Sequence, residues 1–140
     1  MSIRRISLDE YYLNIAKAVS VRSSCICRQY GAVIVNNREI IATGYNGSPR
    51  GETNCCDLGY CKRYDPKDSV AQHNDGNYDL CNSVHAEQNA MLSAARKDMI
   101  GATLYLYGQE NNMPISVELC PICQRMANNA GIDRIVVSKE

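Results

Sequence analysis

The chain has 140 residues, enough for one domain with a sizeable core, and its 15 basic and 15 acidic residues give no formal net charge. This balance argues against a nucleic-acid-binding surface, which usually carries an excess of Lys and Arg, and favours a small substrate. No apolar run is long enough to span a bilayer and the first residues lack a signal peptide's apolar core, so we expect a cytoplasmic protein without a membrane partner. Eight cysteines in such a chain are better explained by metal ligation than by disulfides.

The first third of the sequence predicts a helix followed by a β-hairpin. Apolar residues recur at three- and four-residue steps over residues 8–21. Ser7 is the expected N-cap, with Glu10 in the capping-box position. Two apolar, partly β-branched runs within residues 31–45 flank Asn36-Asn37. We expect a β-hairpin here, because Asn tolerates the positive φ of a tight turn.

The middle of the sequence combines irregular segments with one strong helix. A turn-rich loop at 46–51 leads into residues 51–80, which show little periodicity but hold several cysteines. A loop of this length inside a domain is expected to be held by something, and the cysteines point to a metal. Residues 84–99 predict the central helix, with a small-residue face for packing on a sheet and Asn82 or Ser83 as its cap.

The last third predicts a strand at 102–107, a polar stretch at 108–114, a helix at 120–129 and a final strand at 134–137. The order of elements predicts an α/β protein. We expect a three-layer α/β/α sandwich with a mixed sheet of four to five strands, formed by residues 1–140 as a single domain.

Two short motifs carry the candidate chemistry. His85 and Glu87 form a His-x-Glu motif, and Cys120 and Cys123 form a Cys-x-x-Cys motif. One His and two Cys make a three-ligand zinc site whose fourth position stays open, as in catalytic sites, and Glu87 is left over as a proton carrier. Separately, the motifs are typical of a surface helix start and of a structural half-site, a redox pair or two buried small residues. Together they resemble the signature of the zinc-dependent nucleobase deaminases, with Leu119 where that signature has Pro.

The spacing of these residues also constrains the local structure. Residues two apart are separated by about 200° around an ideal helix, so His85 and Glu87 can face one site only where the helix begins. Cys120 and Cys123 lie in the first turn of the other predicted helix, where the helix dipole lowers thiol pKa and favours the thiolates that bind zinc. If the two helices lie side by side on one face of the sheet, their N-termini meet and the three ligands converge.

Longer segments resemble the deoxycytidylate (dCMP) deaminase family of the cytidine deaminase superfamily. The resemblance implies a cytidine-deaminase-like fold and zinc-dependent hydrolysis of dCMP to dUMP and ammonia. It assigns a catalytic zinc to His85, Cys120 and Cys123, a zinc-bound hydroxide as nucleophile, and Glu87 as proton shuttle. The segments that carry it are Gly-Ala-Val-Ile-Val at 31–35, Thr-Gly-Tyr-Asn-Gly-Ser-Pro-Arg-Gly at 43–51, His-Ala-Glu-Gln-Asn-Ala at 85–90, Ala-Ala-Arg at 94–96, Gly-Ala-Thr-Leu-Tyr at 101–105 and Asn-Ala-Gly-Ile at 129–132.

The same resemblance implies substrate and effector contacts. Asn46 would contact the substrate, and the backbone around Ala86 would form part of the base pocket. A substrate phosphate needs a cation or a nest of N–H groups, for which Arg28 and Arg50 are candidates, although either can equally be a solvated surface residue. Many family members are hexamers activated by dCTP and inhibited by dTTP, so we expect a homo-oligomer. Residues 107–119 are longer than the matching link in many members and are expected to shape the pocket or a subunit contact.

Related members carry a second, structural zinc, and the resemblance implies that it is held here by Cys25, Cys55, Cys61 and Cys81. Four soft ligands make a closed structural site, which would hold the long loop. Three alternatives stay open: Cys27 in place of Cys25, Cys56 in place of Cys55, and His73 as an outside ligand. Any one of these cysteines can instead be a small buried residue.

Two other kinds of function remain. The first keeps the chemistry but changes the substrate to another cytosine nucleotide, such as CMP, or to an adenosine in RNA. The neutral charge and the Gly-Tyr-Asn-Gly element argue against RNA. The second is a catalytically silent, zinc-stabilised regulatory module. The intact Glu87 argues against it, because a purely structural metal site does not need this carboxylate.

Overall fold

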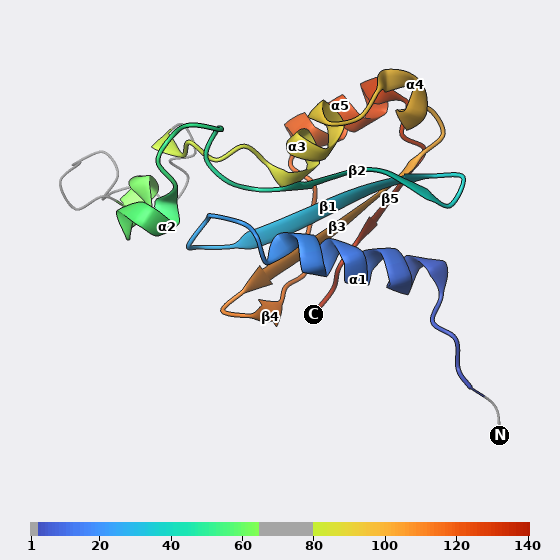
Figure 1. The fold of residues 1–140 in the computed structure, drawn as a ribbon, viewed down its shortest axis with the longest axis horizontal. Helices are drawn as coiled ribbons and strands as arrows, with labels where there is room; N and C mark the ends of the chain where they lie inside the picture. Colours follow the sequence, from blue (N-terminus) through green and yellow to red (C-terminus); the bar gives the residue numbers. More distant parts are fainter. Residues whose placement is uncertain (1–2, 65–79) are drawn as a thin grey trace.

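A computed structural model describes residues 3–64 and 80–140. Its centre is a five-stranded mixed sheet, which confirms the predicted class (Figure 1). Strand β1 (Gln29–Asn36) pairs antiparallel with β2 (Glu39–Tyr45) and with β3 (Thr103–Glu110). Strand β3 also pairs in parallel with β5 (Arg134–Val137) and, at its far end, antiparallel with the two-residue β4 (Met113–Pro114).

Helices cover both faces of this sheet, which gives the expected three layers (Figure 1). Helix α1 (Leu8–Ser20) lies alone on one face. The opposite face carries α3 (Ala86–Leu92), α4 (Arg96–Met99) and α5 (Pro121–Ala130). The short helix α2 (Cys55–Leu58) and the 3-10 turn η1 (Lys62–Tyr64) belong to the long connection between β2 and α3. Among the helices of residues 3–64 and 80–140, none has the length and apolar character needed to cross a membrane.

Alternate residues of β1 and β3 pack on opposite layers. Val33, Val35, Tyr105 and Tyr107 face α1 and form one core cluster with Tyr12 and Ala16. Burial on both faces explains why these strands are continuous apolar runs rather than alternating ones. The other cluster, on the side of α3 and α5, contains Ala32, Ile34, Leu104, Leu106, Ala86, Ala90 and Ala127.

Two glycines allow the helices to lie directly on the strands. A Cβ at Gly31 of β1 would stand 2.0 Å from the carbonyl oxygen of Ala16 in α1. A Cβ at Gly44 of β2 would stand 2.3 Å from the backbone nitrogen of Ala90 in α3. Both distances are impossible contacts, so any side chain at either position would push a helix off the sheet. The second approach matters for the site, because it seats α3 beside the segment that follows β2.

Helix α1 agrees with its prediction to within one residue, and its start is tied to the sheet. The N–H of Glu10 donates to Oγ of Ser7 at 3.1 Å, while the Glu10 carboxylate pairs with Arg4 instead of completing a capping box. Asp9 accepts from the Tyr105 hydroxyl at 2.8 Å and pairs with Arg134. The Arg134 guanidinium lowers the pKa of the Asp9 carboxyl, and burial raises the pKa of Tyr105 to about 12.

The predicted helix over residues 84–99 is wrong in its length, because two helices occupy this range. Helix α3 ends at Leu92, and α4 begins only at Arg96. The N–H of Ser93 is shared between two carbonyls of α3, and Ala95 adopts an extended conformation. A run rich in Ala continues the apolar pattern across this break, so periodicity alone does not reveal it.

The polar stretch at 108–114 forms a β-hairpin, so the strand predicted at 102–107 is longer than expected. Residues 108–110 continue β3, and a two-residue turn leads into β4. Asn111 and Asn112 both have positive φ, which a tight hairpin turn requires and Asn tolerates. Further along, Val117 is buried and its N–H donates to the Ser138 carbonyl at 3.2 Å, so this segment packs back onto the sheet.

The first hairpin forms as predicted, but its turn lies one residue later than expected. Asn36 still pairs with Glu39 at the end of the β1–β2 ladder. The positive φ angles therefore fall on Asn37 and Arg38, and Arg38 is a residue that the sequence does not mark as a turn former.

Candidate metal centre

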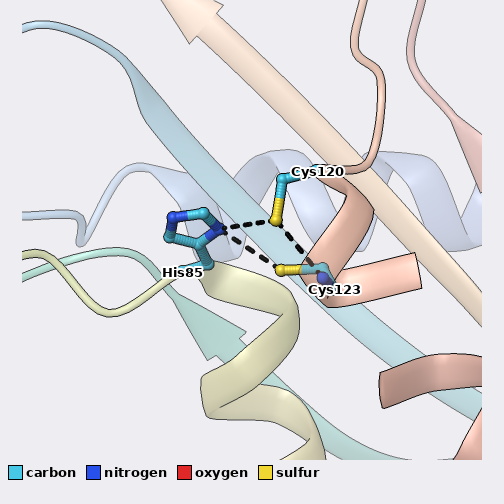
Figure 2. Close-up of side chains that lie close together, drawn as sticks. All are labelled: His85, Cys120 and Cys123. Carbon is cyan, nitrogen blue, oxygen red and sulfur yellow. Dashed lines mark hydrogen bonds between the residues drawn. The ribbon is translucent and has the colours of Figure 1, made fainter. Parts of the chain in front are cut away.

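The N-terminal ends of α3 and α5 meet on the same face of the sheet, as the sequence predicts. His85 is the N-cap of α3, Cys120 is the N-cap of α5, and Cys123 lies within the first turn of α5. Their ligand atoms all lie within 4.8 Å of one another. Figure 2 shows the imidazole and both sulfurs pointing toward a common centre from the two helices.

His85 stands outside the helix that Glu87 occupies, which resolves the angular conflict between the two residues. The His85 N–H donates to Oε1 of Gln88 at 3.0 Å, and this bond closes the first turn of α3. The preceding residue, Val84, forms an isolated β-bridge with Gly47, in which the Val84 N–H donates to the Gly47 carbonyl at 2.7 Å. Neither Asn82 nor Ser83 is therefore the cap. His85 has extended backbone angles, as an N-cap residue does.

The Cys-x-x-Cys motif forms the start of α5. The Cys123 N–H donates to the Cys120 sulfur at 3.2 Å, so the thiol takes the place that an oxygen has in an ordinary N-cap. Pro121 follows in the first helical turn, where its missing N–H costs no hydrogen bond and its fixed φ suits the helix. This turn brings both sulfurs to the end of α5 that faces His85 (Figure 2).

The three side chains fit a zinc ion in both chemistry and spacing. The His85 Nδ1 atom lies 3.3 Å from the Cys123 sulfur and 3.5 Å from the Cys120 sulfur. Two such atoms bound to one tetrahedral zinc would stand about 3.6 Å apart, given bond lengths of about 2.0–2.1 Å to nitrogen and 2.3 Å to sulfur. One imidazole and two thiols are also a donor set that suits zinc.

Burial opposes the predicted lowering of thiol pKa at Cys123. This side chain is fully buried, and its burial raises the pKa of the thiol well above the ordinary value. The negative charge of the nearby Glu87 carboxylate raises it further. Desolvation therefore outweighs the positive end of the helix, and a bound cation has to supply the stabilisation that a Cys123 thiolate requires.

Glu87 lies beside the ligands without being one of them. It belongs to the first turn of α3, and only 5% of its surface is exposed. A carboxylate this deeply buried is rare unless it has a partner or a function. Its influence on Cys123 places its charge next to the three-ligand centre, where a proton carrier would have to stand.

Asn46 is buried and directly precedes Gly47 in the chain. Because Gly47 forms a β-bridge with Val84, Asn46 is next to a residue that pairs with the segment holding His85. Its carboxamide is bonded to protein on several sides. Oδ1 accepts from the Ser23 hydroxyl at 2.6 Å and from the Tyr30 N–H at 2.8 Å, and Nδ2 donates to the Arg28 carbonyl at 3.0 Å.

The remaining substrate candidates have different surroundings. Ala86 is fully buried in α3 directly after His85. The Arg28 side chain is half exposed and approaches Glu110 at 3.7 Å. Arg50 is exposed in the loop that follows Asn46.

A second set of cysteines, from the segment before β1 and from the long connection, influence one another electrostatically. Burial raises the pKa of the Cys55 thiol, and the nearby Cys25, Cys61 and Cys81 raise it further. Burial also raises the pKa of Cys27 to about 12, with Cys61 as the main neighbouring group. Among the residues that the structure describes, only His85, Cys120 and Cys123 bring their ligand atoms within 4.8 Å of one another.

The alternative ligands differ in how they are placed. Cys56 is exposed, and only its backbone N–H reaches inward, to the Ser24 carbonyl at 3.1 Å. His73 lies outside the described residues.

Two residues that support this centre are missed by the sequence. Gln88 closes the first turn of α3, but a His N-cap does not match the Ser/Thr capping-box pattern that would reveal it. Ser23 bonds to Asn46 across a separation of 23 residues, which no local pattern reports.

Comparisons with known proteins agree on one family. The family described as "Cytidine and deoxycytidylate deaminase zinc-binding region" matches residues 6–139. The deoxycytidylate deaminase of Mycobacterium phage D29 is 39% identical over 134 residues, which cover 94% of each chain. The deoxycytidylate deaminase of Saccharomyces cerevisiae is 37% identical over 139 residues, and the match spans 98% of this chain but 39% of the yeast protein.

Solved structures give the same result. The apo dCMP deaminase of cyanophage S-TIM5 superposes with a TM-score of 0.67 at 27% identity, covering 98% of this chain and 86% of that one. The same cyanophage enzyme in complex with dCMP and dUMP superposes with a TM-score of 0.63 at 26% identity, covering 96% and 83% of the two chains.

Proposed function

This chain belongs to the cytidine and deoxycytidylate deaminase family, and we propose that it hydrolyses dCMP to dUMP and ammonia. The observation that carries the proposal is the convergence of one imidazole, two thiols and a buried carboxylate at the N-terminal ends of α3 and α5. Relatives named deoxycytidylate deaminase, and a solved relative that holds both dCMP and dUMP, support the substrate and the product.

In this mechanism His85, Cys120 and Cys123 hold the metal, and Glu87 moves the protons. Zinc bound there would supply the Lewis acidity that makes a water molecule nucleophilic near neutral pH. Glu87 takes a proton from the attacking water and delivers it to the ring nitrogen beside the carbon under attack. It then takes the second proton from the oxygen that has been added to the ring carbon and passes it to the exocyclic amine, so that the C–N bond breaks and ammonia leaves as the C–O bond becomes a carbonyl.

We propose that four residues bind the nucleotide. Asn46 contacts the substrate, and the backbone at Ala86 forms part of the base pocket. Arg28 and Arg50 are the candidates for binding the phosphate. This choice is supported by their positions before and after Asn46 in the sequence. The half-exposed ion pair between Arg28 and Glu110 is weak enough for a phosphate to displace.

The substrate assignment predicts a simple order of activities. Zinc-loaded protein is expected to release ammonia from dCMP faster than from deoxycytidine or CMP, because the phosphate and the deoxyribose both contribute to recognition. Ammonia release from the three compounds, measured side by side, checks this order. Faster turnover of CMP would reassign the enzyme to another cytosine nucleotide. If the protein turned over an adenosine-containing RNA and none of the three compounds, the substrate would be RNA rather than a nucleotide.

We also infer a second, structural zinc ion on Cys25, Cys55, Cys61 and Cys81. The mutual influence of these thiols supports a common site, and four thiolates would leave no open position. Cys55→Ser is expected to lose this zinc and to retain the zinc on His85, with a lower melting temperature. Zinc content per chain and thermal unfolding measure both effects. Cys56→Ser is the matched control, since Cys56 is the exposed neighbour, and equal zinc loss in both variants would contradict the assignment.

The family resemblance further supports a cytoplasmic homo-oligomer, a hexamer as in many members, activated by dCTP and inhibited by dTTP. Sedimentation should therefore give a mass several times that of one chain. The dCMP saturation curve is expected to be sigmoidal, to become hyperbolic with dCTP and to shift to higher dCMP with dTTP, as in a two-state oligomer. A monomer with hyperbolic kinetics under all three conditions would contradict this expectation.

A further inference from the structure

The hydroxyl of Ser23 holds the side chain and the backbone of Asn46 together. Its Oγ lies 2.6 Å from Oδ1 of Asn46 and 2.8 Å from the Asn46 carbonyl oxygen, so its single hydrogen is shared between these two acceptors. It also accepts from the Cys25 N–H at 3.2 Å. Ser23 lies in the short segment between α1 and β1.

The hydrogen bonds of Asn46 determine which way its amide points. The Tyr30 N–H can only donate, and it faces Oδ1 at 2.8 Å. The Arg28 carbonyl can only accept, and it faces Nδ2 at 3.0 Å. A flipped amide would set donor against donor and acceptor against acceptor, so the orientation is fixed by partners that cannot change roles.

A count of donors and acceptors shows what remains for a ligand. Both acceptor positions of Oδ1 face a donor: the Tyr30 N–H, and the hydroxyl hydrogen that Ser23 shares between Oδ1 and the Asn46 carbonyl. One of the two Nδ2 hydrogens is used by the Arg28 carbonyl. Asn46 therefore keeps a single N–H donor and has no acceptor left. Only 6% of its surface is exposed, so other side-chain conformations are blocked by packing.

We propose that Ser23 is a positioning residue, which holds Asn46 so that it offers the substrate one N–H donor and no acceptor. The proposal rests on the proposed function for the identity of that substrate. It implies that the substrate atom facing Asn46 is a hydrogen-bond acceptor, an oxygen or an unprotonated nitrogen.

The same geometry links Asn46 to the metal centre. Asn46 precedes Gly47, whose N–H donates to the Val84 carbonyl at 3.2 Å, and Val84 precedes His85. A shift of the Asn46 backbone would therefore pass through one β-bridge to the segment that carries the histidine. Ser23 donates to both the backbone carbonyl and the side chain of Asn46. The Ser23 hydroxyl therefore restrains the Asn46 backbone next to the bridge as well as the carboxamide.

Three variants test the role of Ser23 in the zinc-loaded full chain. Ser23→Ala removes the hydroxyl and is expected to raise KM for dCMP about fivefold, the effect of one ordinary hydrogen bond, with kcat changed by less than about twofold. Ser23→Thr keeps the hydroxyl and is expected to restore KM. Ser24→Ala is the matched control, because the neighbouring hydroxyl makes no hydrogen bond to Asn46 and KM should stay at the wild-type value.

A second readout needs no substrate. In protein labelled with nitrogen-15, Ser23→Ala is expected to shift the side-chain amide signal of Asn46 and to speed its hydrogen exchange severalfold. Ser23→Thr and Ser24→Ala should leave this signal near its wild-type position. If Ser23→Ala does not fold, Ser23→Cys keeps the size but donates weakly, and it is expected to change KM and the amide signal in the same direction.

The outcomes separate the positioning role from the proposed function. An unchanged Asn46 amide signal in Ser23→Ala would overturn the positioning role, whether or not dCMP is turned over. A loss of kcat together with loss of zinc would overturn it too, since that would mean a general structural role. If wild-type protein does not deaminate dCMP while the amide signal still shifts, the proposed function fails and the positioning of Asn46 stands.

Discussion

Replacing Glu87 by Gln is expected to lower kcat for dCMP by about 10²- to 10⁴-fold, the usual contribution of general acid–base catalysis. Gln has nearly the same size and hydrogen-bonding reach as Glu, but it cannot take up a proton and release it again. Glu87 is only 5% exposed, so the amide would remain at the position where the proton has to be transferred. Steady-state ammonia release from dCMP by wild type and variant measures the loss.

Zinc content and thermal unfolding of the Glu87→Gln variant show whether the loss is chemical. Both are expected to stay at wild-type values, because the three ligands and the first turn of α3 are unchanged. Glu118→Gln removes an acidic charge close to the ligand pair from an exposed position, and it should keep wild-type kcat. Turnover by Glu87→Gln within about tenfold of wild type would contradict the proton-shuttle role. If the wild type were as inactive as the Glu87→Gln variant, the result would favour a silent regulatory module.

Replacing Cys120 by Ser is expected to abolish activity by removing the catalytic zinc while leaving the fold intact. The Cys120 sulfur has two roles, as ligand and as N-cap acceptor for the Cys123 N–H at 3.2 Å. Ser is among the preferred N-cap residues, so the hydroxyl can replace the sulfur as a cap but not as a zinc-binding thiolate. The melting temperature of metal-free protein should therefore stay unchanged or rise slightly.

Competition with a chelator measures the zinc affinity of the Cys120→Ser variant. We expect it to fall by more than about 100-fold, because even the loss of a residue that supports a ligand costs about 10- to 100-fold. Asn128→Ala, at an exposed position on the same helix, is the control and should bind zinc as wild type does. Unaltered zinc affinity in Cys120→Ser would remove Cys120 from the ligand set.

The parts of the centre that the sequence predicts are those governed by local geometry. The angular separation of His85 and Glu87 requires a helix that begins close to the histidine, and α3 does so, although its N-cap is His85 rather than the expected Asn82 or Ser83. Pro121 and Gly131 mark the start and the end of α5 in the same way. Local chemistry was sufficient in these places, because each rule concerns residues within one turn of helix.

The parts that the sequence does not predict depend on neighbours that are distant in the chain. The break after Leu92 falls at Ser93, between residues that otherwise favour helix, and the apolar pattern continues across it without marking the end of α3. The raised pKa of Cys123 follows from complete burial, which outweighs a helix-end effect that the motif alone suggests. The bond from Ser23 to Asn46 joins two loops and leaves no periodic signal.

The division of β1 and β3 between two faces has a consequence for mutational tolerance. Tyr12 and Tyr105 meet on the face of α1, while the metal ligands stand on the opposite face. Apolar substitutions that repack Tyr12 against Tyr105 can therefore change how long the protein survives heating without changing how fast it turns over substrate. Among variants that differ only on the α1 face, we expect heat resistance and catalytic rate to vary independently. Selection for one property would then leave the other free to change.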